Sequence, residues 1–168
     1  MKMYTVKRGI PNLVGVIILL CSIVFFLNTQ SAHALATIRL DDGTTALDIA
    51  DGSILDTSLA AGVITYSGSI GNFTVNVTTG VQGGTTSLPI LAFNTFDISN
   101  SSGGTLTAWF SNTGFGPTSS PAGYTMHGSG TAIQGSGTVN FYSYIDNTNT
   151  MFGEGTLLGS LGPYFRVF

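Results

Sequence analysis

The chain is short of charge and of cysteine. Its 168 residues include five basic residues, eight acidic residues, two histidines and one cysteine, Cys21. That cysteine, both lysines and one arginine lie within the first 36 residues, so the rest carries two arginines against eight acids, a formal charge of −6. Phosphate backbones and anionic headgroups are bound by clustered Lys and Arg, which excludes nucleic acid as a partner. Without a thiol, residues 37–168 can form neither disulfides nor thiolate metal sites.

The first 36 residues have the order of a secretory signal peptide. A basic start precedes an uncharged apolar run of fifteen residues, 13–27, and a polar stretch then leads to small residues. The run is shorter than the ~20 residues that cross a bilayer as a helix, which favours a cleaved leader over an uncleaved anchor. Leu20 is too large to precede a lipid-attached Cys21. We therefore expect a secreted, extracellular or periplasmic protein with no membrane anchor after cleavage.

Two overlapping small-x-small sites end the leader. Cleavage at the first site, Ala32-His33-Ala34, would follow Ala34, and cleavage at the second, Ala34-Leu35-Ala36, would follow Ala36. We favour Ala36, which makes residues 1–36 the signal peptide and leaves residues 37–168 as a single domain. Cleavage after Ala34 is the alternative.

The hydrophobic pattern of residues 37–168 has a period of two. Apolar Phe73, Val75 and Val77 alternate with polar residues over 71–78, which predicts a strand with these three side chains on one face. No stretch shows a sustained helical stripe, and glycine recurs too often for one. Shorter strands are predicted at 37–40, 46–49, 63–66, 88–98, 124–133 and 164–168.

Two further strands place aromatic residues on an outer face. Residues 105–111 put Trp109 opposite their apolar side, and residues 138–145 put Tyr142 and Tyr144 together on the outer side. Turn signals that include Asp42-Gly43, Asp51-Gly52 and Gly83-Gly84 lie between the predicted strands. Eight to ten short strands with frequent turns predict an all-β fold, an antiparallel β-sandwich or jelly roll.

The outward aromatic residues and the aspartates are the candidate binding residues. Flat rings on a sandwich face can stack on sugars, so Trp109, Tyr142 and Tyr144 are candidate carbohydrate ligands, although packing under a loop is the commoner role. Five aspartates fall within sixteen residues, and calcium takes six to eight oxygen ligands in such loops. Asp-Gly is also an ordinary β-turn pair, so turns are favoured over calcium. The candidate calcium ligands are Asp41, Asp42, Asp48, Asp51 and Asp56.

Little in the sequence supports catalysis. His127 is the only histidine after the leader, and no Gly-x-Ser-x-Gly motif marks a serine for it to activate. Glycosidases need paired carboxylates, whereas Glu154, Asp97 and Asp146 occur singly. We expect no enzyme and no cofactor apart from the calcium considered above.

Two runs carry a resemblance to a known group of proteins. Residues 62–80 (GVITYSGSIGNFTVNVTTG) and 102–111 (SGGTLTAWFS) resemble uncharacterised secreted bacterial β proteins, many of which end in a PEP-CTERM sorting signal. The similarity extends through 144–146 and 155–159 and consists of strand and turn residues. It implies an envelope or extracellular-matrix setting in a Gram-negative bacterium, often beside exopolysaccharide production, and carries no established activity.

The end of the chain departs from that group. No Pro-Glu-Pro occurs, and the sequence stops at Phe168. Either the protein is freely secreted, or the chain is truncated and residues 164–168 are an unpaired apolar edge. We expect a secreted or cell-envelope structural, matrix-associated protein without catalytic activity, whose partners are extracellular polysaccharide or envelope proteins. A carbohydrate-binding module is the alternative, and a hydrolase is the third possibility.

Overall fold

The computed structural model describes residues 36–85, 88–115, 123–131 and 136–166. The chain divides into two compact units, Met1–His33 and Ala34–Phe168. The predicted leader lies outside the described residues except for Ala36, so the fold below is that of the second unit. Among the described residues no helix is long and apolar enough to cross a membrane.

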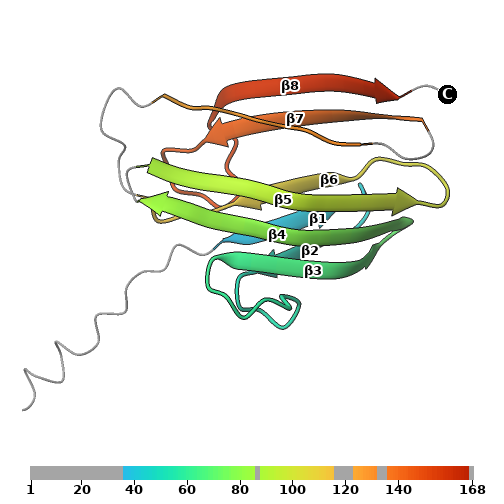
Figure 1. Ribbon diagram of the computed structural model, residues 1–168, viewed down its shortest axis with the longest axis horizontal. Coiled ribbons are helices and arrows are strands. Elements are labelled where there is room, and N and C mark those ends of the chain that lie inside the picture. The colour runs from blue at the N-terminus through green and yellow to red at the C-terminus, as the bar shows by residue number, and fades with distance from the viewer. Residues whose placement is uncertain (1–35, 86–87, 116–122, 132–135, 167–168) are drawn as a thin grey trace, which may run out of the picture. The chain divides into compact units, whose positions relative to one another are not determined.

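Eight strands and no helix occur in the described part of the chain (Figure 1). Every strand pair is antiparallel, which confirms the predicted all-β class and the predicted number of strands. The strands are β1 (Thr37–Asp41), β2 (Ala46–Ala50), β3 (Val63–Ile70), β4 (Phe73–Thr85), β5 (Leu88–Asn100), β6 (Thr107–Ser111), β7 (Gly137–Ile145) and β8 (Thr156–Arg166).

The strands form three sheets. Sheet A has the order β2–β1–β6, sheet B the order β3–β4–β5, and sheet C pairs β7 with β8. Hairpins join β1 to β2, β3 to β4 and β4 to β5. The turn between β1 and β2 is held by Asp42, whose carboxylate accepts the backbone N–H groups of Thr44 and Thr45 at 2.9 and 2.7 Å. Only the β1–β6 pair joins strands that are distant in sequence.

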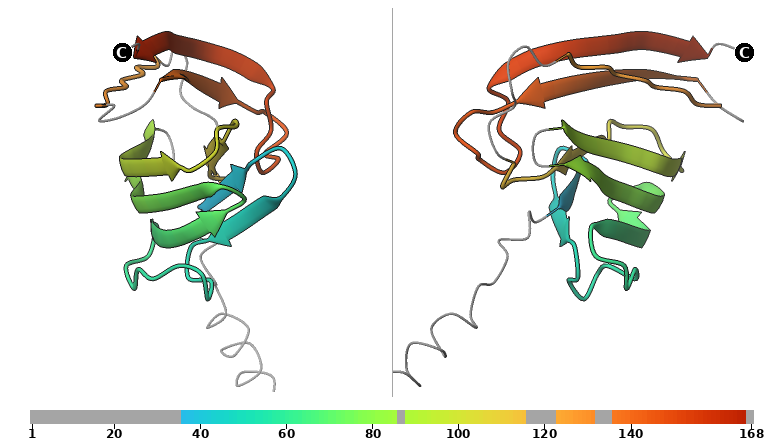
Figure 2. Two further views of the ribbon diagram at one scale, coloured as in Figure 1. Left: turned by 90° about the vertical axis from the view of Figure 1, so that its right-hand side faces the viewer. Right: turned by 60° about the vertical axis from the view of Figure 1, so that its left-hand side comes forward.

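Sheets A and B share one hydrophobic core. Apart from Ala36, which directly precedes β1, the core side chains come from β1 and β2 in sheet A and from β3 and β4 in sheet B. Figure 2 shows these strands in blue and green. Leu106, Ala108 and Phe110 pack against this core, as the alternation around β6 predicts. Burying each large side chain contributes about 1.5–3 kcal/mol. The core residues are Ala36, Ile38, Leu40, Ile49, Ile64, Tyr66, Ile70, Phe73, Val75 and Val77.

Strand β3 is twice the predicted length because Tyr66 and Gly68 fit together. The Tyr66 side chain, 8% exposed, lies over Gly68, where an added Cβ would collide with its hydroxyl group and ring. Residues i and i+2 of a strand share a face, so the glycine makes room for the neighbouring ring. The strand then continues to Ile70, which is buried in the core.

Three details of the strand prediction are wrong. Gly83 and Gly84 lie inside β4, opposite Ile90 and Pro89, because the β4–β5 ladder continues through them. Residues 124–131, the described part of the predicted strand 124–133, form no strand. Residues 164–166 of the short strand predicted at 164–168 are the end of β8, which begins at Thr156 and whose two irregularities in register with β7 hide its alternation; residues 167–168 lie outside the described residues.

Candidate functional site

The outer face of sheet A carries a charged and aromatic row. Arg39 on β1 is paired with Asp48 on β2 and with Trp109 on β6. Directly paired residues of antiparallel strands share a face. Ile38 and Leu40, on either side of Arg39, are fully buried in the core. Trp109 therefore lies on the face away from the core, as the sequence predicts.

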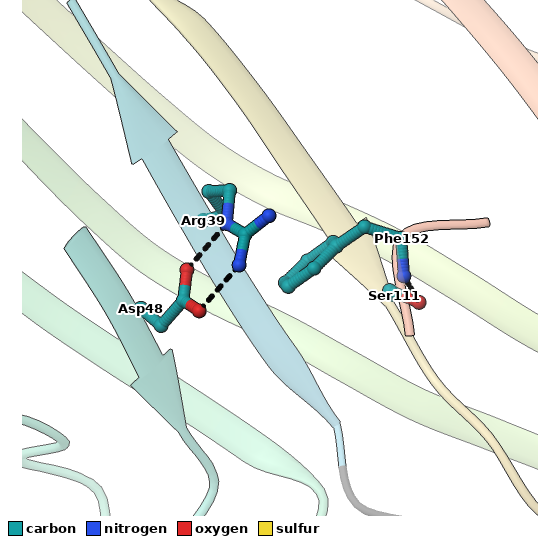
Figure 3. A network of polar contacts seen from close by, with 4 residues as sticks. All are labelled: Arg39, Asp48, Ser111 and Phe152. Carbon is teal, nitrogen blue, oxygen red and sulfur yellow. Dashed lines mark hydrogen bonds and ion pairs between the residues drawn. The ribbon is translucent and has the colours of Figure 1, made fainter. Parts of the chain in front are cut away.

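Arg39 is held between Asp48 and a phenylalanine ring (Figure 3). Its Nε and one terminal nitrogen donate to the two carboxylate oxygens of Asp48 at 2.6 Å each. The guanidinium carbon lies 4.3 Å from the ring centroid of Phe152. The hydrogen bonds with Arg39 hold the pKa of Asp48 below its usual range. Both charged side chains are more than a third exposed, so the ion pair itself contributes only about 0.2–1 kcal/mol.

The loop 146–155, between β7 and β8, supplies Phe152. Its backbone N–H donates to Ser111 Oγ at 3.0 Å, as Figure 3 shows. Trp109 Nε1 donates to Glu154 Oε1 at 3.3 Å. These contacts attach the loop to the outer face of sheet A. We call Arg39, Asp48, Trp109, Phe152 and Glu154 the clasp.

The carboxylate of Asp146 shapes the loop that carries the clasp. It accepts hydrogen bonds from Thr148 N, Thr148 Oγ1 and Thr150 N at 3.0, 2.6 and 3.0 Å. These bonds, that of the Thr148 hydroxyl first, lower the pKa of Asp146. Phe152 has a φ of 57°, which costs a non-glycine residue about 1–2 kcal/mol. The contacts of Phe152 with Ser111 and Arg39 offset that cost.

One face of sheet C carries exposed aromatic side chains. Tyr142 and Tyr144 are 58% and 38% exposed, and their ring centroids lie 6.5 Å apart at 32°. Register places Leu157 opposite Tyr144 and Phe165 opposite Thr138, on the same face. Leu157 and Phe165 are 52% and 69% exposed. We call Tyr142, Tyr144, Leu157 and Phe165 the aromatic face.

The other face of sheet C is partly covered. Phe141 and Tyr164 are in edge contact there, with ring centroids 6.2 Å apart. The segment 123–131 lies against it, since an added Cβ on Gly128 would contact the side chains of Phe141 and Leu161. The segment thus packs on one side of the two-stranded sheet and leaves the aromatic face free.

The three predicted carbohydrate ligands do not form one surface. Tyr142 and Tyr144 lie together on sheet C, whereas Trp109 is half-buried on sheet A and donates to Glu154. Leu157 and Phe165 could not be predicted as members of this face, because irregular register hides which residues of β8 face the tyrosines.

Arg39 and Phe152 were also missed. The pairing of Arg39 with Asp48 could have been found by aligning the two strands about the Asp42-Gly43 turn. Phe152 and Glu154 carry no such signal, because their partners lie 41 and 45 residues away in the sequence.

Four of the five candidate calcium ligands accept backbone hydrogen bonds, two of them in the β1–β2 turn. Asp41 accepts Gly43 N at 2.7 Å, Asp51 accepts Gly62 N at 2.8 Å, and Asp56 accepts the N–H groups of residues 52, 58 and 65, each at 2.9 Å. Asp42 holds the β1–β2 turn, and the bonds from Thr44 and Thr45 lower its pKa.

The fifth candidate, Asp48, belongs to the clasp. Within the described ranges, no three His, Cys, Asp or Glu side chains gather as a metal-binding group. The turn role is thus visible for Asp41 and Asp42. Asp51 and Asp56 also accept from residues as far along the chain as Gly62 and Thr65, and calcium binding stays a prediction.

His127, the basis of the hydrolase hypothesis, lies exposed in segment 123–131 rather than on a strand. Of the single acids considered for catalysis, Glu154 accepts from Trp109, Asp146 shapes the loop, and Asp97 is exposed on β5.

Comparison with protein-family models, with curated proteins and with solved structures gives no match to this chain.

Proposed function

We propose that this is an exported, matrix-associated structural protein without catalytic activity, which acts by binding through the aromatic face of sheet C. The observation that carries the proposal is the exposure of four large apolar or aromatic side chains on one side of a two-stranded sheet. Contiguous exposed apolar side chains mark interaction surfaces in folded proteins. The leader and the resemblance to secreted bacterial β proteins support the extracellular setting.

The chemistry of the aromatic face favours a neutral polysaccharide as its partner. The residues that register places opposite the tyrosines, Ser160 and Leu157, carry no charge. A tyrosine ring offers an apolar surface to the C–H groups of a sugar and a hydroxyl group for hydrogen bonding. The chain after the leader has a formal charge of −6, which repels acidic polymers.

A polysaccharide pull-down tests this binding. The exported protein is incubated with an insoluble neutral β-glucan and, separately, with an immobilised acidic polyuronate. We expect binding to the glucan that weakens on the order of tenfold in the double variant Tyr142→Ala/Tyr144→Ala, because two ring contacts of roughly 0.5–1.5 kcal/mol each are lost. Tyr124→Ala is the matched control, since Tyr124 is 49% exposed and lies outside sheet C.

The outcomes separate the alternatives. Equal binding by the double variant and by the control would refute the role of the tyrosine pair. Binding to neither polymer would leave envelope proteins as the partners of the aromatic face, and cross-linking to the extracellular matrix would then identify them. Recovery of the protein only from the cytoplasm would contradict the matrix-associated role.

A further inference from the structure

The first residues of the described fold bear on where the leader is cut. Ala36 is fully buried in the core shared by sheets A and B. Its carbonyl oxygen accepts the backbone N–H of Asp51 at 2.9 Å, which extends the β1–β2 ladder by one residue beyond Thr37 and Ala50. Ala36 is therefore part of the folded domain, and not only the last residue of a leader.

Asp51 also makes a second hydrogen bond, to the turn before β3. Its backbone N–H binds Ala36, and its carboxylate accepts the N–H of Gly62 at 2.8 Å. Gly62 has a φ of 76° and immediately precedes β3. One residue thus connects the start of β1, the end of β2 and the turn that leads into sheet B.

Cleavage after Ala36 would damage this arrangement in three ways. It would remove a methyl group from the core, and it would leave the N–H of Asp51 without its acceptor. It would also place the new α-ammonium group on Thr37, which is 6% exposed and lies on the central strand of sheet A between Ala50 and Ser111. A buried ammonium group needs a compensating partner or loses its proton.

Cleavage after Ala34 leaves the contacts of Ala36 and the peptide bond before Thr37 intact. The product keeps Ala36 and its carbonyl group, and the ammonium group moves two residues away, to Leu35. Both sites satisfy the small-x-small rule, so the rule does not choose between them. We infer that the leader is removed between Ala34 and Leu35, in place of the site after Ala36 that the sequence favours, and that the mature domain begins at Leu35. This inference rests on the proposed export.

Intact mass and N-terminal sequencing of the exported protein test the inference. The full chain with its own leader is expressed in a secreting bacterial host, and the product is purified from the periplasm or medium. We expect a chain that begins at Leu35. A chain that begins at Thr37 overturns the inference and leaves the proposed export intact. A chain in the periplasm or medium that retains Met1 overturns the inference alone. Recovery of the protein only from the cytoplasm overturns the proposed export as well, so the two failures are distinguishable.

A leader variant gives a second, independent test. Ala32→Gln removes the small residue that only the site after Ala34 requires, and it leaves Ala34 and Ala36 available for the other site. We expect this variant either to remain uncut or to begin at Thr37, and the Thr37 product to melt about 5 °C or more below the wild-type protein. If Ala32→Gln and wild type yield the same product with the same melting temperature, the inference is wrong.

Discussion

Replacing Ile38 with alanine tests whether sheets A and B share one core. Ile38 is fully buried on β1, and its side chain belongs to the same cluster as those of β3 and β4. The substitution removes three carbon groups, each worth about 0.8 kcal/mol of transfer free energy. The cavity adds to this loss, so the free energy of unfolding should fall by about 2–5 kcal/mol. For a domain of this size, that corresponds to a melting temperature lower by about 10 °C.

The chain offers a matched control for this substitution. Ile54 lies between β2 and β3 and is 100% exposed. Ile54→Ala removes the same atoms from a residue that contributes nothing to the core, so stability should change by no more than about 0.5 kcal/mol. The difference between the two variants therefore measures burial and not the chemistry of isoleucine.

Urea unfolding of the exported protein, followed by the fluorescence of Trp109, measures both variants. Trp109 is the only tryptophan of the chain and lies on sheet A, on the face away from the core. An unfolding free energy that falls equally in Ile38→Ala and Ile54→Ala would refute the shared core. A loss smaller than about 1 kcal/mol in Ile38→Ala would do the same, because Ile38 could not then be enclosed on all sides.

Two further predictions concern packing and pH. Gly68→Ala forces the ring of Tyr66 out of its position and should lower the unfolding free energy by about 1–3 kcal/mol in the same assay, whereas Gly123→Ala, which has open space around it, should not. The pKa values of Asp48 and Asp146 are lowered from 3.8 in the folded protein. The two carboxylates therefore stabilise the fold fully above about pH 5, and this contribution is lost as the pH falls through their pKa values in the folded state. Melting temperatures between pH 2 and pH 7 should show this acid loss, and Asp146→Asn should reduce it; an identical pH dependence in the variant would contradict the assigned role.

The faces of single strands could be predicted because they depend on a local period of two. Phe73, Val75 and Val77 are buried as the alternation requires. Trp109 lies opposite the core, and the Tyr142–Tyr144 pair is exposed for the same reason. A regular strand fixes these directions whatever its partner is.

Features that depend on a partner distant in the sequence could not be predicted. The pairing of β1 with β6 and the contacts of Phe152 and Glu154 join residues more than forty positions apart. Irregular register in β8 moves residues between faces without any mark in composition. Gly83 and Gly84 look like a turn because glycine favours turns, yet a continuing ladder can include them.

The clasp and the aromatic face are connected through the loop 146–155. A two-stranded sheet is marginally stable alone, so sheet C needs support from elsewhere. Segment 123–131 covers one face, and the clasp attaches the β7–β8 loop to sheet A through Arg39 and Trp109. Both supports leave the aromatic face exposed while limiting the motion of the strands that carry it. A surface fixed before binding loses less entropy when it binds, which favours contact with an extended polymer. Asp48 was considered as a calcium ligand and Glu154 as a catalytic acid. In the proposed function, both side chains instead help to hold an uncharged surface in place.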